Sequence, residues 1–474
     1  MANTFNTYFS MVVQHIHTEK FKNSNSGVSE NNSLNYSYNV FKQLIPSIKL
    51  KFVSPKETED VVSSLKMKDS HGFDGIYTKI LKLSIPYISS PLTYICNLMI
   101  STDIFPTRLK FSEIKPLYKK GEMANIYNCR PISLLTSFSK ILEKIVFTRL
   151  IHHLNYSNIL ADEQFGFRAK SYMDLASYKL INDILTSLNN KLIVEGVLCD
   201  LQKASDCVDH DLLLSKMHWY GISGKGYNLI PSYLKNRYQR VIIANKSRQY
   251  YSEWEPIRYD IPQGPILGLL FLILCINDLP KTMAILANRV LFVDDTSMII
   301  TKSDPMEFTN TINRNIIKIN KWFKSNSLSL NIDKTHFLQF HMKIIQNDDF
   351  QISYENKQIT KAQTIKFLRI TIDSNSSCKQ HIDDIIPKLS KACFAIRSIK
   401  PFMSLEVMRL IYFSYFYSVL SYGIIFCDNS IHSKYIFKIK KRTIRVITNS
   451  GIRDSCQDLF KKTADPASLY SQYI

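Results

Sequence analysis

The stretch Leu291-Phe292-Val293-Asp294-Asp295-Thr296-Ser297-Met298 places two adjacent carboxylates between two apolar runs. The apolar residues on either side predict a strand, a tight turn at the two acids, and a second strand. Another acid, Asp200, stands at the end of an apolar run over residues 192–201. A carboxylate at the end of a buried strand is costly to desolvate unless something pairs with it. Brought together, Asp200, Asp294 and Asp295 would repel one another, and a divalent cation would relieve that repulsion.

Carboxylate oxygens suit Mg²⁺, which keeps several waters and accepts substrate phosphates. Two such ions about 4 Å apart can activate an attacking hydroxyl and hold the leaving group in phosphoryl transfer. Each segment alone has a plainer interpretation, because an Asp-Asp pair between strands is usually a turn and an Asp that ends a strand is usually a cap. The order of the segments along the chain, and the motifs around them, decide between these interpretations.

Outward from these segments, short strands alternate with helices, which predicts an α+β fold. The expected helices cover residues 58–65, 139–154, 211–220, 269–277 and 306–326. The expected strands cover residues 111–120, 192–201, 241–244, 258–261, 289–300 (with the turn inside), 336–340 and 364–373. Residues 1–50 begin with a short helix and continue as a polar linker, so we expect that a segment once lay upstream. From Cys378 onward the chain is helical, basic and aromatic. The boundaries that follow are a linker over 1–50, a main α+β region over 51–375 and a helical region over 376–474.

The composition narrows the class of protein. The 474 residues include 60 Lys and Arg against 40 Asp and Glu, a formal charge of +20. This surplus favours polyanionic partners, nucleic acid before acidic membrane, although an ordinary soluble basic protein would also show it. Nine scattered cysteines without CxxC pairs or zinc-ligand spacing fit a reducing compartment. The longest apolar run, residues 266–276, is shorter than the about 20 residues that span a bilayer, so we expect no membrane insertion.

A series of ordered motifs links these segments along residues 50 to 470. They are Ile114 to Gly121, Asn128 to Leu135, Gln164 to Arg168, Asp200 to Ala204, Ile261 to Gly264, Phe292 to Asp295, Leu330 to Thr335, and Phe367-Leu368. In this order they resemble the reverse transcriptase of non-LTR retrotransposons, especially the jockey and CR1-like groups. A group II intron or telomerase-type polymerase is a weaker alternative, because the blocks Arg130 to Leu135 and Gln164 to Arg168 favour the retrotransposon branch.

The resemblance implies a right-hand polymerase with fingers and palm over 51–375 and a thumb in the helical C-terminal region. It implies RNA template, DNA primer and deoxynucleoside triphosphates as partners, two Mg²⁺ ions (or Mn²⁺) as cofactors, and a cytoplasmic and nuclear location. Asp200, Asp294 and Asp295 match the metal-binding catalytic carboxylates. Lys334 matches the lysine that protonates pyrophosphate, and the alternative interpretation is that Lys334 is a plain surface lysine. The residues that match the nucleotide site are Lys115, Arg130, Ser205, Gln263 and Gly264. The basic cluster that suits nucleic acid, or else an ordinary solvated helical face, is Lys438, Lys440, Lys441, Arg442 and Arg445.

The chain also departs from the family pattern. Ser205 stands where the family has an aromatic residue that excludes the 2′-hydroxyl, which predicts weaker rejection of ribonucleotides. Pro265 replaces a serine, and Asp260 and Arg369 replace glycines, at a cost of about 1 kcal/mol if the backbone has positive φ. Residues 463–466 break the closing pattern, and Val293 is a milder change. We expect weak activity, with a catalytically dead nucleic-acid-binding remnant as the alternative. We expect neither the family's endonuclease nor an RNase H domain within this chain.

Overall fold

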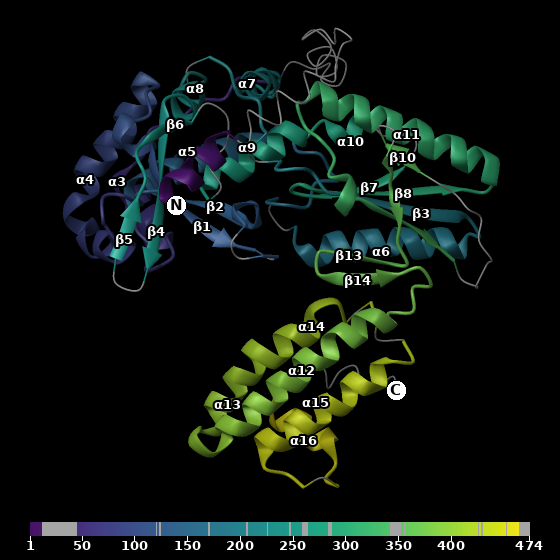
Figure 1. Ribbon diagram of the computed structural model, residues 1–474. Helices are drawn as coiled ribbons and strands as arrows, with labels where there is room; N and C mark the ends of the chain where they lie inside the picture. The colour runs from purple at the N-terminus through teal and green to yellow at the C-terminus, as the bar shows by residue number, and fades with distance from the viewer. Residues whose placement is uncertain are drawn as a thin grey trace.

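The central sheet of the protein carries the acidic segments (Figure 1). Its strands run in the order β12 (Thr360–Lys361), β9 (His336–Phe340), β3 (Ile193–Cys199), β8 (Asp295–Lys302) and β7 (Asn288–Phe292). β3 pairs antiparallel with both β8 and β9, so Val197 lies between Met298 and Phe337. This places the chain segment after β3 beside the start of β8. The expected strand at 336–340 and the strand–turn–strand at 289–300 are confirmed.

The computed structural model describes residues 1–11, 45–119, 121–122, 125–168, 171–204, 207–224, 226–245, 248–257, 264–282, 287–341, 352–354, 357–424, 426–427, 430–451 and 453–463. Residues 2–11 are helical, as expected, whereas most of the expected linker and the expected strand over 258–261 lie outside the described residues. Within the described part of the chain, no helix combines the length and the apolar character needed to cross a bilayer.

Helices cover both faces of the central sheet because its strands are apolar on both sides. On one face, α6 (Met173–Asn189) packs Leu180 and Ile184 against Val194 of β3. On the other face, α11 (Pro305–Ser325) and the entirely apolar α9 (Ile266–Ile276) share one core with Val197. A helix that is apolar on all sides is expected in a protein interior. α9 accordingly lies buried, and it packs against α5 (Ser137–Tyr156).

A second sheet contains strands that come before β3 in the chain and strands that come between β3 and β7 (Figure 1). Its order is β2 (Cys129–Leu134), β1 (Phe111–Tyr118), β4 (Arg237–Asn245) and β5 (Arg248–Tyr251), and β6 (Glu255–Ile257) also pairs with β4. β1 is antiparallel to β2 and parallel to β4. The helices beside this sheet and the remaining short elements of the main region are α3 (Pro55–Ser64), α4 (Thr78–Thr102), α7 (His210–Trp219), α8 (Leu229–Leu234), α10 (Leu279–Thr282), β10 (Ser353–Tyr354) and β11 (Lys357–Gln358).

The C-terminal helices form a separate lower part of the molecule in Figure 1 with their own hydrophobic core. They follow a hairpin of β13 (Thr364–Phe367) and β14 (Ile370–Asp373). The helices are α12 (Lys379–Ile399), α13 (Leu405–Ile411), a π-helical turn over Tyr412–Tyr417, α14 (Ser418–Ile424), α15 (Ser433–Thr448) and α16 (Cys456–Lys462). Together, the two sheets and these helices confirm a mixed α/β architecture.

Candidate active site

Asp294 and Asp295 lie at the tip of the β7–β8 hairpin. Phe292 pairs with Asp295, so only Val293 and Asp294 make the turn. Val293 has φ of +58°, a conformation that a β-branched residue rarely adopts. Although we expected valine to be a mild change here, the backbone is strained at this position. The surrounding structure must therefore hold the turn in place.

The buried side chain of Gln164 holds this turn. Its Oε1 accepts hydrogen bonds from Val293 N (3.0 Å) and from Gly166 N (2.8 Å), and its Nε2 donates to Val293 O at 3.5 Å. A Cβ atom on Gly166 would lie 2.7 Å from Val293 N, so only glycine fits there. Sequence reasoning included Gln164 and Gly166 in a motif but assigned them no role, because their contacts with the turn are long-range.

Asp200 follows β3, the strand next to β8. Lys334 Nζ lies 3.2 Å from Asp200 Oδ2, and the Asp200 backbone carbonyl accepts a hydrogen bond from Asn331 N at 2.8 Å. Thr335 Oγ1 accepts from Asp200 N at 3.3 Å. The structure therefore brings together Asp200 and Lys334, two residues that the sequence placed in one site.

The three carboxylates influence one another electrostatically. Burial, followed by the negative charges of Asp294 and Asp200, raises the pKa of Asp295 to about 6. Burial is also the largest cause that raises the pKa of Asp294, and the charge of Asp200 adds to it. Both side chains still have exposed surface. The burial that shifts their pKa values therefore means that protein atoms crowd the carboxyl groups, and not that water is excluded. The protein around Asp294 and Asp295 therefore disfavours the charged forms of both carboxyl groups.

The donor chemistry of this site fits a divalent cation such as Mg²⁺, because all the candidate ligands are carboxylate oxygens that destabilise one another's charge. The side chains are not already gathered around a point, however. Among the residues that the structure describes, no three Asp, Glu, His or Cys side chains converge closely enough to hold a metal ion. Asp200 instead pairs with Lys334.

Two cations act on the acidic tip, one in the second sheet and one just after its strand β1. The charges of Arg130 and Lys119 both lower the pKa of Asp294, opposing the effect of burial. Arg130 lies in β2 and is exposed, as a phosphate-binding residue must be. Sequence reasoning selected Arg130 but missed Lys119, although the basic end of the strand over 111–120 was a usable signal.

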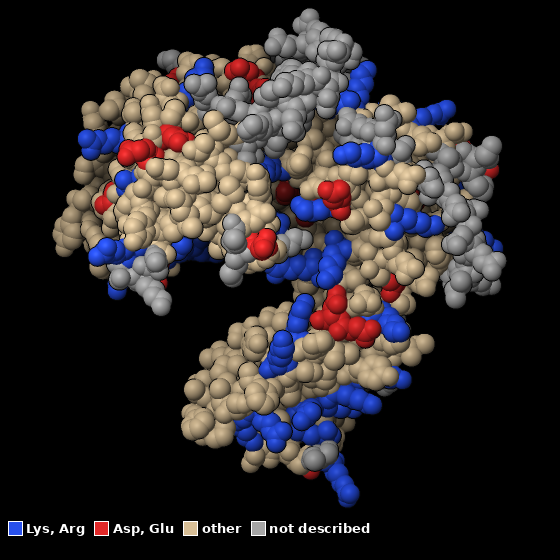
Figure 2. Space-filling model, viewed as in Figure 1, with Lys and Arg blue, Asp and Glu red and all other residues tan. Residues whose placement is uncertain are grey.

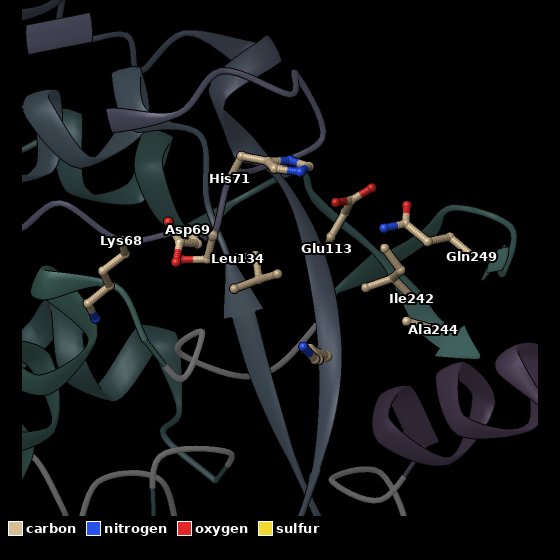
Figure 3. A pocket seen from close by; sticks show the side chains of 10 residues that line it. Lys68, Asp69, His71, Glu113, Leu134, Ile242, Ala244 and Gln249 are labelled. Atoms are coloured by element: carbon tan, nitrogen blue, oxygen red, sulfur yellow. The ribbon is translucent and has the colours of Figure 1, made fainter. Parts of the chain in front are cut away.

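Lys115 lines a different feature, a cavity of about 410 Å³ on the second sheet. Its wall also includes Lys68, His71, Glu113 and Gln249. Figure 3 shows Glu113 of β1 and Gln249 of β5 facing the same space, with β4 between their two strands and the loop that carries His71 above them. The cavity is therefore lined mainly by polar and charged side chains.

Gly264 lies against the edge strand of the second sheet. Its φ is +129°, and a Cβ atom there would lie 2.9 Å from Ser133 O in β2. The position therefore needs glycine, because of β2 and its own positive φ. The next residue, Pro265, has φ of −61°, which its ring favours, and directly precedes α9. Ser205 and Gln263, the other expected nucleotide-site residues, lie outside the described residues, as does Asp260.

The expected nucleic-acid cluster lies on α15. Lys438 and Arg442 are exposed, whereas Lys440 is 5% exposed with its ammonium 5.0 Å from the Phe460 ring centroid. Lys441 lies 4.3 Å from the Phe437 ring centroid, and Arg445 donates to the Asp454 carbonyl. Figure 2 shows Lys and Arg side chains on the lower surface of the C-terminal helices and around the hollow above them.

Comparison with known proteins agrees with these observations. The family described as "Reverse transcriptase (RNA-dependent DNA polymerase)" matches residues 118–372. The "Probable RNA-directed DNA polymerase from transposon BS" of Drosophila melanogaster is 27% identical over 420 residues, covering 85% of this chain and 45% of that protein. The "RNA-directed DNA polymerase from mobile element jockey" of the same organism is 25% identical, covering 72% of this chain and 37% of that protein. The chain thus spans less than half the length of these relatives.

The match begins in β1, at Tyr118, and continues to Ile372 in β14. It therefore contains the acidic residues of the central sheet and Arg130 of the second sheet. It covers more than half of the chain, and the relatives are polymerases of mobile elements, jockey among them. The expected resemblance is therefore confirmed, and the protein belongs to the reverse transcriptase (RNA-dependent DNA polymerase) family, with relatives in non-LTR retrotransposons.

Proposed function

We propose that this chain is an RNA-directed DNA polymerase that adds deoxynucleotides to a primer 3′-hydroxyl by phosphoryl transfer. The observation that carries the proposal is the electrostatic grouping of Asp200, Asp294 and Asp295 on adjacent strands, with Arg130 and Lys119 acting on Asp294 from the facing sheet. The cations suit the negative charge of a bound triphosphate, and the carboxylates suit the metal ions that assist its cleavage.

The proposed architecture is a right-hand polymerase. The central sheet with Asp200 and the β7–β8 tip is the palm, and the second sheet with Arg130 forms part of the fingers, together within residues 51–375. Residues 376–474, with their separate core, form the thumb. A division of this kind places the primer and template across the hollow that Figure 2 shows.

Asp200, Asp294 and Asp295 would hold two Mg²⁺ ions, or Mn²⁺, which supply charge that lowers the barrier to attack by the 3′-hydroxyl and to departure of pyrophosphate. Arg130 would bind and orient the triphosphate, and Lys119 would add positive charge beside it. Lys115 lines the cavity on the second sheet, and its proposed contact with the triphosphate rests on its pairing with Ile132, two residues from Arg130 in β2. The absence of a Cβ on Gly264 would let the backbone approach the nucleotide closely. Tight geometry matters in this step, since a small misplacement of the reacting atoms costs much of the rate.

Lys334 is proposed to donate a proton to the leaving pyrophosphate. Its ammonium lies 3.2 Å from Asp200 Oδ2, and this ion pair holds it beside the site. On the C-terminal helices, the exposed cations Lys438 and Arg442, with Lys441 and Arg445 nearby, would contact the phosphates of the RNA template and DNA primer.

The test is primer extension on an RNA template with deoxynucleotides and Mg²⁺, comparing the unaltered protein with Asp294→Asn. The substitution keeps the size of the side chain and removes its charge, so we expect extension to fall by at least about a hundredfold, the scale of a lost charge-stabilising group. Asp333→Asn is the matched control, because Asp333 is an exposed acid in the turn beside Lys334. Equal extension by the unaltered protein and Asp294→Asn would refute the proposed site. Primer–template binding without any extension would instead support the remnant that only binds nucleic acid.

A further inference from the structure

A buried carboxylate outside the proposed catalytic group contacts the chain just after Gly264. Glu143, in α5, has no exposed surface, and its two oxygens have different partners. Oε1 accepts a hydrogen bond from the Tyr233 hydroxyl at 2.8 Å, and Oε2 accepts from Ile266 N at 3.1 Å. The buried Arg237 stacks on Tyr233 and adds positive charge nearby. The Glu143 carboxylate is thus fixed at both oxygens.

The contact with Ile266 N gives the first N–H group of α9 a hydrogen-bond acceptor that the helix itself lacks. The first N–H groups of a helix have no partner within the helix and normally bond to an N-cap side chain. The N-cap of α9 is Pro265, which makes no side-chain cap hydrogen bond. Glu143 supplies the missing acceptor from a helix 123 residues earlier in the chain.

This contact also limits where Gly264 can lie. On one side, Gly264 fits against Ser133 O so closely that a Cβ atom would clash. On the other side, Ile266 is tied to Glu143. Only one residue, Pro265, separates the two anchors, and its ring restricts φ. The backbone of Gly264 therefore has little freedom to move relative to β2, the strand that carries Arg130.

We propose that Glu143 is a positioning residue, which sets the affinity for the incoming nucleotide by anchoring the start of α9 and thereby the Gly264 backbone. This inference rests on the proposed polymerase function. Glu143 touches no substrate in this scheme and acts only through the backbone at Gly264–Ile266. Its role depends on reaching Ile266 N, not on carrying a charge.

Two substitutions of Glu143 distinguish the length of its side chain from its charge. Glu143→Gln keeps the length of the side chain, so its amide oxygen can accept from Ile266 N while its NH₂ donates to the Tyr233 oxygen. Glu143→Asp keeps the carboxyl group but is one methylene shorter, which takes it out of hydrogen-bond range of Ile266 N, now 3.1 Å away. Tyr233→Phe is the matched control, since it removes one hydrogen bond to Glu143 and leaves the Ile266 contact.

The measurement is the dissociation constant of the next deoxynucleotide in a complex of protein, RNA template and dideoxy-terminated primer. This primer cannot be extended, so the assay needs no chemistry. We expect Glu143→Asp to weaken nucleotide binding about tenfold, the effect of one lost hydrogen bond of about 1.4 kcal/mol. Glu143→Gln and Tyr233→Phe should stay within about twofold of the unaltered protein, a difference of less than about 0.5 kcal/mol. Hydrogen exchange over residues 264–270 of the free protein should quicken only in Glu143→Asp.

The outcomes are distinguishable. Normal nucleotide binding and normal exchange in Glu143→Asp would overturn the positioning role while leaving the polymerase proposal intact. The opposite order, with Glu143→Gln impaired and Glu143→Asp normal, would also overturn it, because charge rather than reach would then matter. If the unaltered protein binds primer–template but no nucleotide, the proposed polymerase function itself fails.

Discussion

Replacing Glu195 by glutamine should stabilise the protein, and increasingly so as pH rises. Glu195 lies in the middle of β3, between Ile300 of β8 and Gln339 of β9, and is 1% exposed. One of its oxygens, Oε1, has no hydrogen-bond partner among the described residues. Burial raises the pKa of this carboxyl from 4.5 to about 8, despite the opposing charge of Lys361.

The sign follows from proton binding. Between pH 4.5 and 8 the native carboxyl keeps a proton that the unfolded chain has released, so the free energy of unfolding falls as pH rises. Glutamine resembles the protonated form and does not titrate. At 1.36 kcal/mol per tenfold change in proton affinity, the advantage of Glu195→Gln should grow by about 3 kcal/mol between about pH 5.5 and about pH 8.5.

The assay is urea unfolding followed by circular dichroism at both pH values, with the free energy extrapolated to zero denaturant. Glu253→Gln serves as the matched control, because Glu253 is exposed. A gain that is the same at both pH values, or that shrinks as pH rises, would refute the reasoning. It would mean that Glu195 finds a partner or water that keeps its carboxylate charged in the native protein.

Two further substitutions test the packing. Arg369→Gly should raise the free energy of unfolding by about 1 kcal/mol, because Arg369 has φ of +70°, which glycine adopts more easily. The control Arg397→Gly, within α12, should lower the free energy of unfolding. Urea midpoints measure both changes, and a lower midpoint for Arg369→Gly would contradict backbone strain at this position. Lys216→Met should cost about 3–5 kcal/mol by thermal unfolding, because it leaves Asp278 buried and unpaired after the loss of a 2.6 Å ion pair. The double change Lys216→Met with Asp278→Leu should recover much of that loss, and no recovery would show that the charge of Asp278 was not the cause.

Local pattern predicted most of the main elements but missed some. Helix α6 was not predicted, although Ala176, Leu180, Ile184 and Leu188 follow helical spacing. β2 was not predicted either, and it contains Pro131, a residue type that normally disfavours a strand. The structure explains the exception, since β2 is an edge strand and Pro131 pairs only with Pro116 of β1. Topology, which decides where a proline is tolerated, is not a local property of the sequence.

The site shows the same limit. The apolar runs beside Asp200, Asp294 and Asp295 pointed to these three acids, and the family resemblance added Lys334. The three acids interact electrostatically in the structure. The residues that support them could not be found in this way. Gln164 and Glu143 act through backbone atoms more than 120 residues away, and no periodicity or spacing encodes such a contact.

The clamp that Gln164 places on Val293 also has a consequence for the order of folding. The hairpin tip is strained, and its stabilising contacts come from a segment 129 residues earlier that pairs with β7. Closing a loop of that length costs chain entropy before any contact compensates for it. We therefore expect the β7–β8 hairpin to form locally and its acidic tip to take its final shape only after residues 163–166 have docked. In that order of events, assembly of the surrounding domain comes before the geometry of the acidic tip.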